Sequence, residues 1–229
     1  MKTEEMDFRN FNHVDAGYAC EVEVIRSDSY SVSVTAGDSI IKSIKVVKED
    51  ETLKIRRTLL SLRGLIPGTF KIKITVPVLK GLDLSGASKG TISGFSSENN
   101  FSTYLKGASS LDILNMSAGN IKFKLTGASR VTGQVKAADA EFNLSGASRV
   151  ELQGSANNII IDAAGASHVD IAGFHVGSAN VKLRGASHST LNIDGQLDAN
   201  LSGASKLYWL GKPVMGDMKT AGASTISRK

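Results

Sequence analysis

The chain has 229 residues, and 27 Lys and Arg against 22 Asp and Glu give it a net charge of +5. This mild basicity is far from that of a nucleic-acid-binding tail, and no apolar run approaches the length of a membrane span, so we expect neither a nucleic-acid partner nor a transmembrane segment. Aromatic residues make up only 6% of the chain while 23 residues are glycine, which suits a thin coil with a narrow interior. The single cysteine, Cys20, excludes an intramolecular disulfide and is expected to be a small buried residue.

Residues 1–80 alternate between apolar and polar positions without a clear repeat. The alternation is strongest in four runs, at residues 21–24, 31–34, 53–56 and 70–76. Apolar residues at every second position predict strands with one buried face. We expect these strands to form irregular first rungs that cap a longer stack, because the terminal repeats of solenoid proteins are usually atypical.

Residues 81–229 repeat the tripeptide Gly-Ala-Ser eight times at intervals of 18 to 21 residues. The repeats begin at Gly86, Gly107, Gly127, Gly146, Gly165, Gly185, Gly203 and Gly222. The second and fourth residues before each glycine, and the fourth after it, are mostly apolar, and the residues between them are mostly polar. So short a unit cannot bury its inner face alone, but it can stack on its neighbours at about 4.8 Å per rung.

The predicted fold is therefore all-β: a single-stranded parallel β-helix, continuous with the first 80 residues in one elongated domain. We expect a right-handed coil, because crossover connections between parallel strands are nearly always right-handed. The leucine-rich horseshoe has a similar repeat length, but its L-x-x-L-x-L pattern is missing.

The Gly-Ala-Ser element is expected to form a tight corner of the coil. Glycine permits the positive φ that a sharp bend requires, and Ala and Ser are small enough to lie directly above and below their copies. If the alternation continues through the bend, the serines point inward and hydrogen bond to one another in a column. The rival interpretation, a serine nucleophile, is disfavoured because the motif occurs eight times.

The order of these segments resembles a bacterial family, the putative auto-transporter adhesins with a head GIN domain. Its parts are Phe11-Asn12-His13-Val14, the strand with Val22 and Val24, residues 30–34, Leu53-Lys54-Ile55, Val76-Pro77-x-Leu79 and then the Leu-x-Gly-Ala-Ser rungs. The resemblance covers essentially the whole chain. The resemblance implies a parallel β-helix in a protein that is secreted or belongs to the cell envelope, and it implies no catalytic residues.

The N-terminal residues Met1–Asp7 are polar and acidic, and they carry no recognisable export signal. The sequence therefore leaves a cytoplasmic protein and an exported protein without its leader both open.

One column next to the corner has the character of a ligand-binding site. The residue after each Gly-Ala-Ser is basic, or can become so, in six of the eight repeats, and these candidates are Lys89, Arg130, Arg149, His168, His188 and Lys206. Stacked on successive rungs they would form a cationic line roughly 35 Å long, suited to a repeating anion such as an acidic polysaccharide. Binding would weaken with salt, and the two histidines would strengthen it in acid.

The alternative is an ordinary solvated surface. Two residues further along each strand lies a second outward column that includes Glu151 and Asp170, which would partly neutralise Arg149 and His168. Similarly, Tyr208-Trp209 could stack on a sugar ring or close the end of the coil.

No metal site, cofactor site or catalytic constellation is predicted. The four histidines lack the spacing of a metal site, and no P-loop or dinucleotide-binding motif occurs. Polysaccharide-acting enzymes often use β-helices, and the nearest candidates here are Lys182 and Arg184 near Asp162, and Arg149 near Glu151 and Asp170.

We therefore expect a non-catalytic structural or adhesive module of the bacterial cell envelope, with glycans or surface proteins as partners. The second hypothesis is a self-assembling scaffold of the bactofilin kind, which associates through the ends or edges of the coil. The third, a polysaccharide lyase or hydrolase, is the least favoured.

Overall fold

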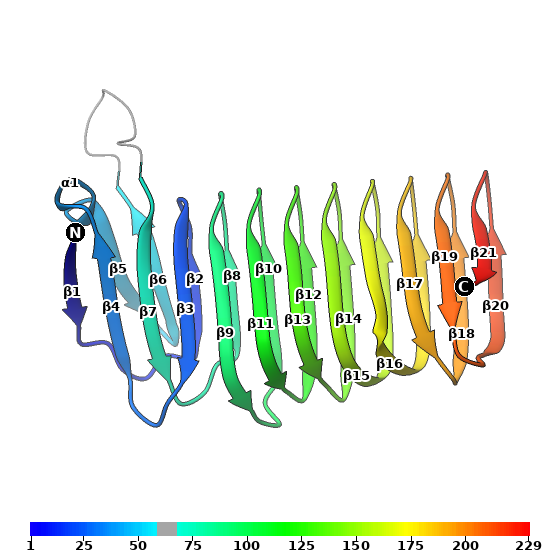
Figure 1. The fold of residues 1–229 in the computed structure, drawn as a ribbon, viewed down its shortest axis with the longest axis horizontal. Coiled ribbons are helices and arrows are strands. Elements are labelled where there is room, and N and C mark those ends of the chain that lie inside the picture. The colour runs from blue at the N-terminus through cyan, green and yellow to red at the C-terminus, as the bar shows by residue number, and fades with distance from the viewer. Residues whose placement is uncertain (59–67) are drawn as a thin grey trace.

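The computed structural model describes residues 1–58 and 68–229 (Figure 1). One short helix, α1 (Asp38–Ile41), accompanies the strands. The strands are β1 (Lys2–Met6), β2 (His13–Ala16), β3 (Cys20–Arg26), β4 (Ser31–Ala36), β5 (Ile44–Glu49), β6 (Thr52–Arg57), β7 (Phe70–Val76), β8 (Gly81–Leu84), β9 (Lys89–Ser96), β10 (Phe101–Leu105), β11 (Ser110–Ser117), β12 (Asn120–Leu125), β13 (Arg130–Lys136), β14 (Asp139–Leu144), β15 (Arg149–Ala163), β16 (His168–Leu183), β17 (His188–Ile193), β18 (Gln196–Leu201), β19 (Lys206–Leu210), β20 (Val214–Thr220) and β21 (Thr225–Arg228).

The strands form a β-solenoid with two parallel stacks, which confirms the predicted fold class (Figure 1). One stack, here called the β9 stack, runs through β3, β9, β11, β13, the first parts of β15 and β16, β17, β19 and β21. The other, the β10 stack, runs through β2, β8, β10, β12, β14, the second parts of β15 and β16, β18 and β20. Each Gly-Ala-Ser corner connects a strand of the β10 stack to the next strand of the β9 stack.

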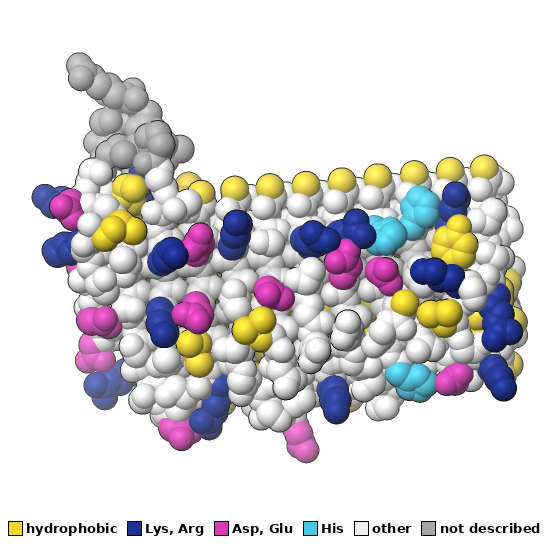
Figure 2. Space-filling view, viewed as in Figure 1, with side chains coloured by type: hydrophobic (Ala, Val, Ile, Leu, Met, Phe, Trp, Pro, Cys, Tyr) yellow, Lys and Arg dark blue, Asp and Glu magenta, His cyan; other side chains and the backbone are white. Residues whose placement is uncertain are grey.

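The corners are built by backbone contacts that only glycine permits. All eight corner glycines have φ between 72° and 82°. A Cβ atom on Gly146 would lie 2.5 Å from the carbonyl oxygen of Gly127 on the rung before it. That same carbonyl accepts a hydrogen bond of 2.8 Å from the N–H of Ala147. The corners therefore form a continuous ladder, and the exposed alanines run along the upper edge of the coil as a straight row (Figure 2).

The corner serines point inward as predicted, but the predicted bonding among them is wrong. Every corner serine from Ser88 to Ser205 is buried. Each hydroxyl donates to the carbonyl oxygen three residues earlier, at 2.8–2.9 Å, as Ser148 does to Ser145. Each hydroxyl therefore bonds to a carbonyl within its own bend.

The core consists of the apolar columns predicted from the repeat. The side chains four and two residues before each corner glycine are buried from Leu82 to Leu201. Aromatic rings contact one another within one column, with Phe123 and Phe142 stacked at 5.4 Å between ring centroids. Alternation with a period of two thus places one side chain in every two inside the coil, on both stacks.

The N-terminal region follows a different path. The four runs of alternating residues form β3, β4, β6 and β7, as predicted. The rung made by β2 and β3 lies between the rung of β6 and β7 and the rung of β8 and β9. After β7 the chain therefore crosses to the other side of β2 and β3 before it forms β8 and β9. β4 pairs with β7, β1 with β4, and β5 with β6, all antiparallel. Parallel coiling alone does not describe this end, and the capping role of residues 1–80 stays a prediction.

Candidate ligand-binding sites

The six predicted basic residues lie in one outward column of the β9 stack, which we call the basic column. Successive residues of this column are register partners, in the order Lys89, Ser110, Arg130, Arg149, His168, His188, Lys206 and Thr225. Figure 2 shows Lys, Arg and His side chains running in a line along this face, below the row of alanines. From Arg130 to Lys206, five consecutive rungs each contribute a basic side chain without interruption.

Two carboxylates lie against the middle of the basic column. Arg130 donates from Nη2 to both carboxylate oxygens of Glu151 at 3.0 Å, and Arg149 donates to the same carboxylate. Burial by itself would raise the pKa of Glu151, but these hydrogen bonds outweigh burial and the pKa is lowered. Asp170 is the register partner of Glu151 on the next rung. Two guanidinium groups therefore share the carboxylate of Glu151, and a second carboxylate, that of Asp170, lies on the next rung.

His168 and His188 are neighbours on adjacent rungs, with ring centroids 6.2 Å apart. Partial burial lowers the pKa of His168, the positive charge of Arg149 lowers it further, and Asp170 opposes both. His168 is therefore mostly neutral at pH 7, and acidification or a bound anion would charge it.

A shallow hollow of about 440 Å³ lies beside the basic column on the same face. Gly133 and Gly173 line it together with Gln134, Gln153 and Glu151. Amide groups both donate and accept hydrogen bonds, so a ligand on the column could also engage the hollow.

Tyr208 and Trp209 lie on opposite faces of β19. Trp209 is partly buried and packs against the core, beside its register partner Leu191. Tyr208 is the register partner of Thr190 in the outward column that contains Glu151 and Asp170. Only Tyr208 is thus placed to contact a ligand on this face.

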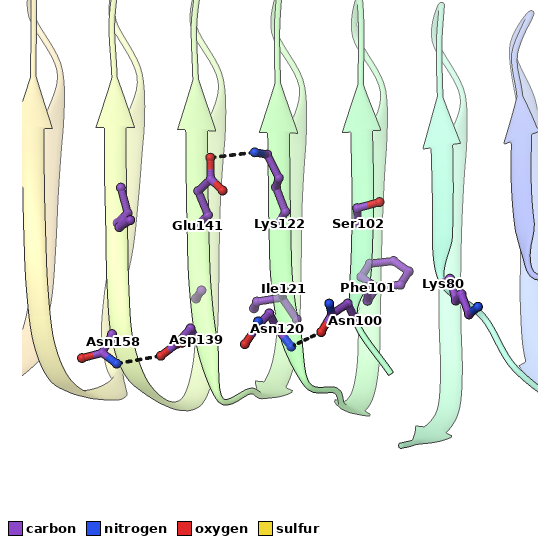
Figure 3. Close-up of a pocket in the computed structure, with 12 residues that line it drawn as sticks. Lys80, Asn100, Phe101, Ser102, Asn120, Ile121, Lys122, Asp139, Glu141 and Asn158 are labelled. Carbon is purple, nitrogen blue, oxygen red and sulfur yellow. Dashed lines mark hydrogen bonds and ion pairs between the residues drawn. The ribbon is translucent and has the colours of Figure 1, made fainter. Parts of the chain in front are cut away.

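A larger groove of about 580 Å³ lies on the β10 stack (Figure 3). At its lower edge, Asn100 accepts a hydrogen bond of 2.9 Å from the backbone N–H of Asn120, and Asn158 donates to Asp139 at 2.8 Å. Above them Lys122 forms an ion pair of 2.8 Å with Glu141, and hydrogen bonds from Lys122 and Asn143 lower the pKa of Glu141. These polar groups bond to one another between rungs, so we interpret their main role as the stabilisation of contacts between adjacent rungs.

Sequence reasoning missed this groove. Its lower edge has a simple signal, since Asn100, Asn120, Asp139 and Asn158 each precede a corner glycine by seven residues. The pattern close to the Gly-Ala-Ser corner does not indicate this edge, because the opposite corner of the coil carries its own column of residues.

The alternative catalytic sets form surface ion pairs. Arg184 contacts Asp162 at 2.6 Å, and Arg149 contacts Glu151. Within residues 1–58 and 68–229, no three His, Cys, Asp or Glu side chains form a group that could hold a metal ion. In the same residues, no helix has the length and apolar character needed to cross a membrane.

Solved structures with the same fold cover the whole chain. A putative lipid binding protein from Parabacteroides distasonis superposes with a TM-score of 0.92 at 18% identity, covering 100% of this chain and 96% of that one. A putative adhesin from Parabacteroides merdae gives 0.91 at 15% identity, covering 100% and 95%. A putative adhesin from Bacteroides fragilis gives 0.75 at 20% identity, covering 100% and 96%. No curated protein matches this sequence significantly.

The family model for the putative auto-transporter adhesin, head GIN domain, matches residues 10–213. This range begins just before β2 and extends beyond β19, so it includes both the irregular first rungs and seven of the eight corners. The chain therefore belongs to the putative auto-transporter adhesin, head GIN domain, family.

Proposed function

We propose that this protein is a non-catalytic adhesive module of the bacterial cell envelope that binds an anionic polysaccharide along the basic column. The observation that carries the proposal is the unbroken register of Arg130, Arg149, His168, His188 and Lys206 on five consecutive strands. Family membership supports the adhesive role and the envelope setting.

The spacing of the column suits a repeating ligand. Rungs follow one another at about 4.8 Å, so a polyanion lying along the coil would meet a new donor at each step. The arginine side chains are 50% and 48% exposed, and their ion pairs with Glu151 leave guanidinium N–H groups facing solvent. Exposed ion pairs of this kind are weak, so an anion can compete with Glu151 at small cost. Several weak contacts on one chain add up to useful avidity.

Self-assembly is the second candidate function. The last described rung, β20 and β21, is mostly exposed, and Val214 and Met215 leave apolar surface there. Concentration-dependent growth in light scattering would favour this candidate, and a constant particle mass would reject it.

The proposed function is tested by binding to acidic and neutral polysaccharides at low and high salt. The test compares wild type with Arg130→Ser/Arg149→Ser and with the control Lys182→Ser/Lys219→Ser, which removes the same charge from the β10 stack. We expect salt-sensitive binding to oligogalacturonate that falls at least tenfold in the first variant and little in the control. Equal losses in both variants would indicate a general charge effect, and no binding by the wild type would reject the proposed ligand. Anionic phospholipid vesicles serve as a further probe, because one relative of the same fold is described as a putative lipid binding protein.

A further inference from the structure

The first corner of the coil departs from the repeat and creates a pocket of its own. Ala16 pairs with Leu84, and Glu21 pairs with Lys89. The four residues 17–20 therefore lie against the corner at residues 85–88. In this register Tyr18 occupies the place of the corner glycine, and the backbone of Gly86 lies directly beside it.

Tyr18 keeps the backbone conformation of that glycine. Its φ is 68°, and Ala19 follows with 59°. For residues other than glycine this left-handed region is strained, and such strain concentrates at functional sites. The side chain of Tyr18 is 48% exposed, so burial does not explain why a tyrosine lies here. This corner therefore places an exposed tyrosine at a position where its backbone conformation is strained.

Tyr18 lines a pocket of about 260 Å³ on the β10 stack. Tyr104 lines the same pocket, and the ammonium groups of Lys106 and Lys124 lie 4.1 Å and 4.7 Å from the centre of its ring. Asp15 and Asp83 supply two carboxylates, and Arg56 supplies a guanidinium group. Two tyrosines and groups of both charges thus line one small hollow.

The polar groups of the pocket are held in place by the strands. Arg56 donates from Nη1 to the carbonyl oxygen of Asp15 at 2.9 Å and also bonds to its carboxylate. Asp83 accepts a hydrogen bond of 2.7 Å from the backbone N–H of Tyr104 through Oδ1, and its Oδ2 lies 3.2 Å from Nε2 of His13. Two carboxylates and two cations line the pocket, so its lining has no excess of either charge and suits an uncharged ligand.

We propose that this pocket binds a neutral sugar residue. Tyrosine rings pack against the C–H face of a sugar ring, carboxylate oxygens accept hydrogen bonds from its hydroxyl groups, and the guanidinium and ammonium groups donate to them. Small polar sites of this composition, with a few fixed groups around aromatic surface, orient a hydroxylated ligand. The site lies on a different face from the basic column and takes a ligand of different charge, so it goes beyond the function proposed above.

Saturation-transfer NMR with neutral oligosaccharides tests the proposal. Fragments of mannan, glucan and galactan are the probes, and wild type is compared with Tyr18→Gly, Tyr104→Ser and Lys182→Ser. Tyr18→Gly places the residue of the eight Gly-Ala-Ser corners at the strained position, so we expect it to fold and to melt at a higher temperature than wild type. We expect wild type and Lys182→Ser to bind at least one neutral fragment, with affinity that changes little with salt, and the two tyrosine variants to lose it at least tenfold.

Two results would overturn this inference. The first is the absence of binding to every neutral fragment by the wild type. The second is equal binding by wild type and Tyr18→Gly, which would show that the tyrosine has no part in recognition. Because the probes are uncharged and the basic column is left intact in both tyrosine variants, either result leaves the proposed binding of acidic polysaccharide to be judged on its own experiment.

Discussion

The regular rungs and the irregular N-terminal rungs of this solenoid offer different kinds of binding surface. In the regular part, equivalent positions of successive rungs lie directly above one another. Basic residues at one such position therefore form a line along the coil, as in the basic column. In the N-terminal part β2 and β3 are inserted between β6–β7 and β8–β9, and unlike residues meet. Repetition thus favours extended, repeating ligands, whereas a break in the repeat produces a discrete pocket.

The largest expected effect breaks a regular corner. Gly146→Ala introduces a Cβ atom 2.5 Å from the carbonyl oxygen of Gly127, at a φ of 80°. Strain and the backbone clash together should lower the free energy of unfolding by about 3 kcal/mol. Chemical denaturation measures this, and a loss within error of zero would contradict the account of the corner ladder.

The opposite change is expected at the irregular corner. Tyr18→Gly relieves the left-handed backbone of Tyr18 and should raise the free energy of unfolding by about 1 kcal/mol. The same denaturation experiment applies, with Tyr104→Ser as a control that removes an aromatic ring without changing the corner. A clear loss of stability in Tyr18→Gly would show that the tyrosine ring contributes to folding more than its backbone costs.

A matched pair of serines on one rung separates bonded from unbonded hydroxyls. Ser187 donates to the carbonyl oxygen of Arg184 at 2.9 Å, whereas the hydroxyl of Ser189, equally buried, has no hydrogen-bond partner among the residues that the structure describes. Ser187→Ala should cost about 1 kcal/mol, and Ser189→Ala should be neutral or stabilising by up to about 1 kcal/mol. Equal effects of the two substitutions would contradict the assigned corner hydrogen bond.

The smallest expected effect is a pH dependence at His168. Its pKa is lowered in the folded protein by burial and by Arg149, so the unfolded chain binds the proton more readily. Stability should therefore fall slightly as the pH drops through the ordinary range of histidine, and level off below the folded pKa. His168→Gln should flatten this part of the profile, which thermal melts between pH 5 and pH 8 would reveal. A steeper profile in the variant would reverse the assigned direction.

The sequence predicted the regular part of the fold well. The Gly-Ala-Ser period located the corners, and alternation identified the buried columns, because each rung repeats the same local constraints. Bonding of the corner serines was predicted wrongly, since the periodicity shows which way Ser148 points but not that the carbonyl of Ser145 lies nearest.

The N-terminal arrangement could not be predicted in the same way. Antiparallel pairing of β1 with β4 and the return of the chain past β2 depend on long-range contacts that alternation does not encode. For the sites, the basic column followed directly from the period. The pocket at Tyr18 did not, because its corner lacks Gly-Ala-Ser and becomes visible only when residues 17–20 lie against residues 85–88.

The central claim, that an anion lies along the basic column, is tested most directly by titrating His168 with NMR. Its pKa would be measured in the free protein and with oligogalacturonate at one fixed concentration near the dissociation constant of the wild type. The account predicts that the pKa of His168 rises when the ligand is present, and that the rise is smaller in Arg130→Ser/Arg149→Ser because less ligand is bound at that concentration. An unchanged pKa in the presence of the ligand would contradict it, since an anion bound to this column must favour the charged form of His168.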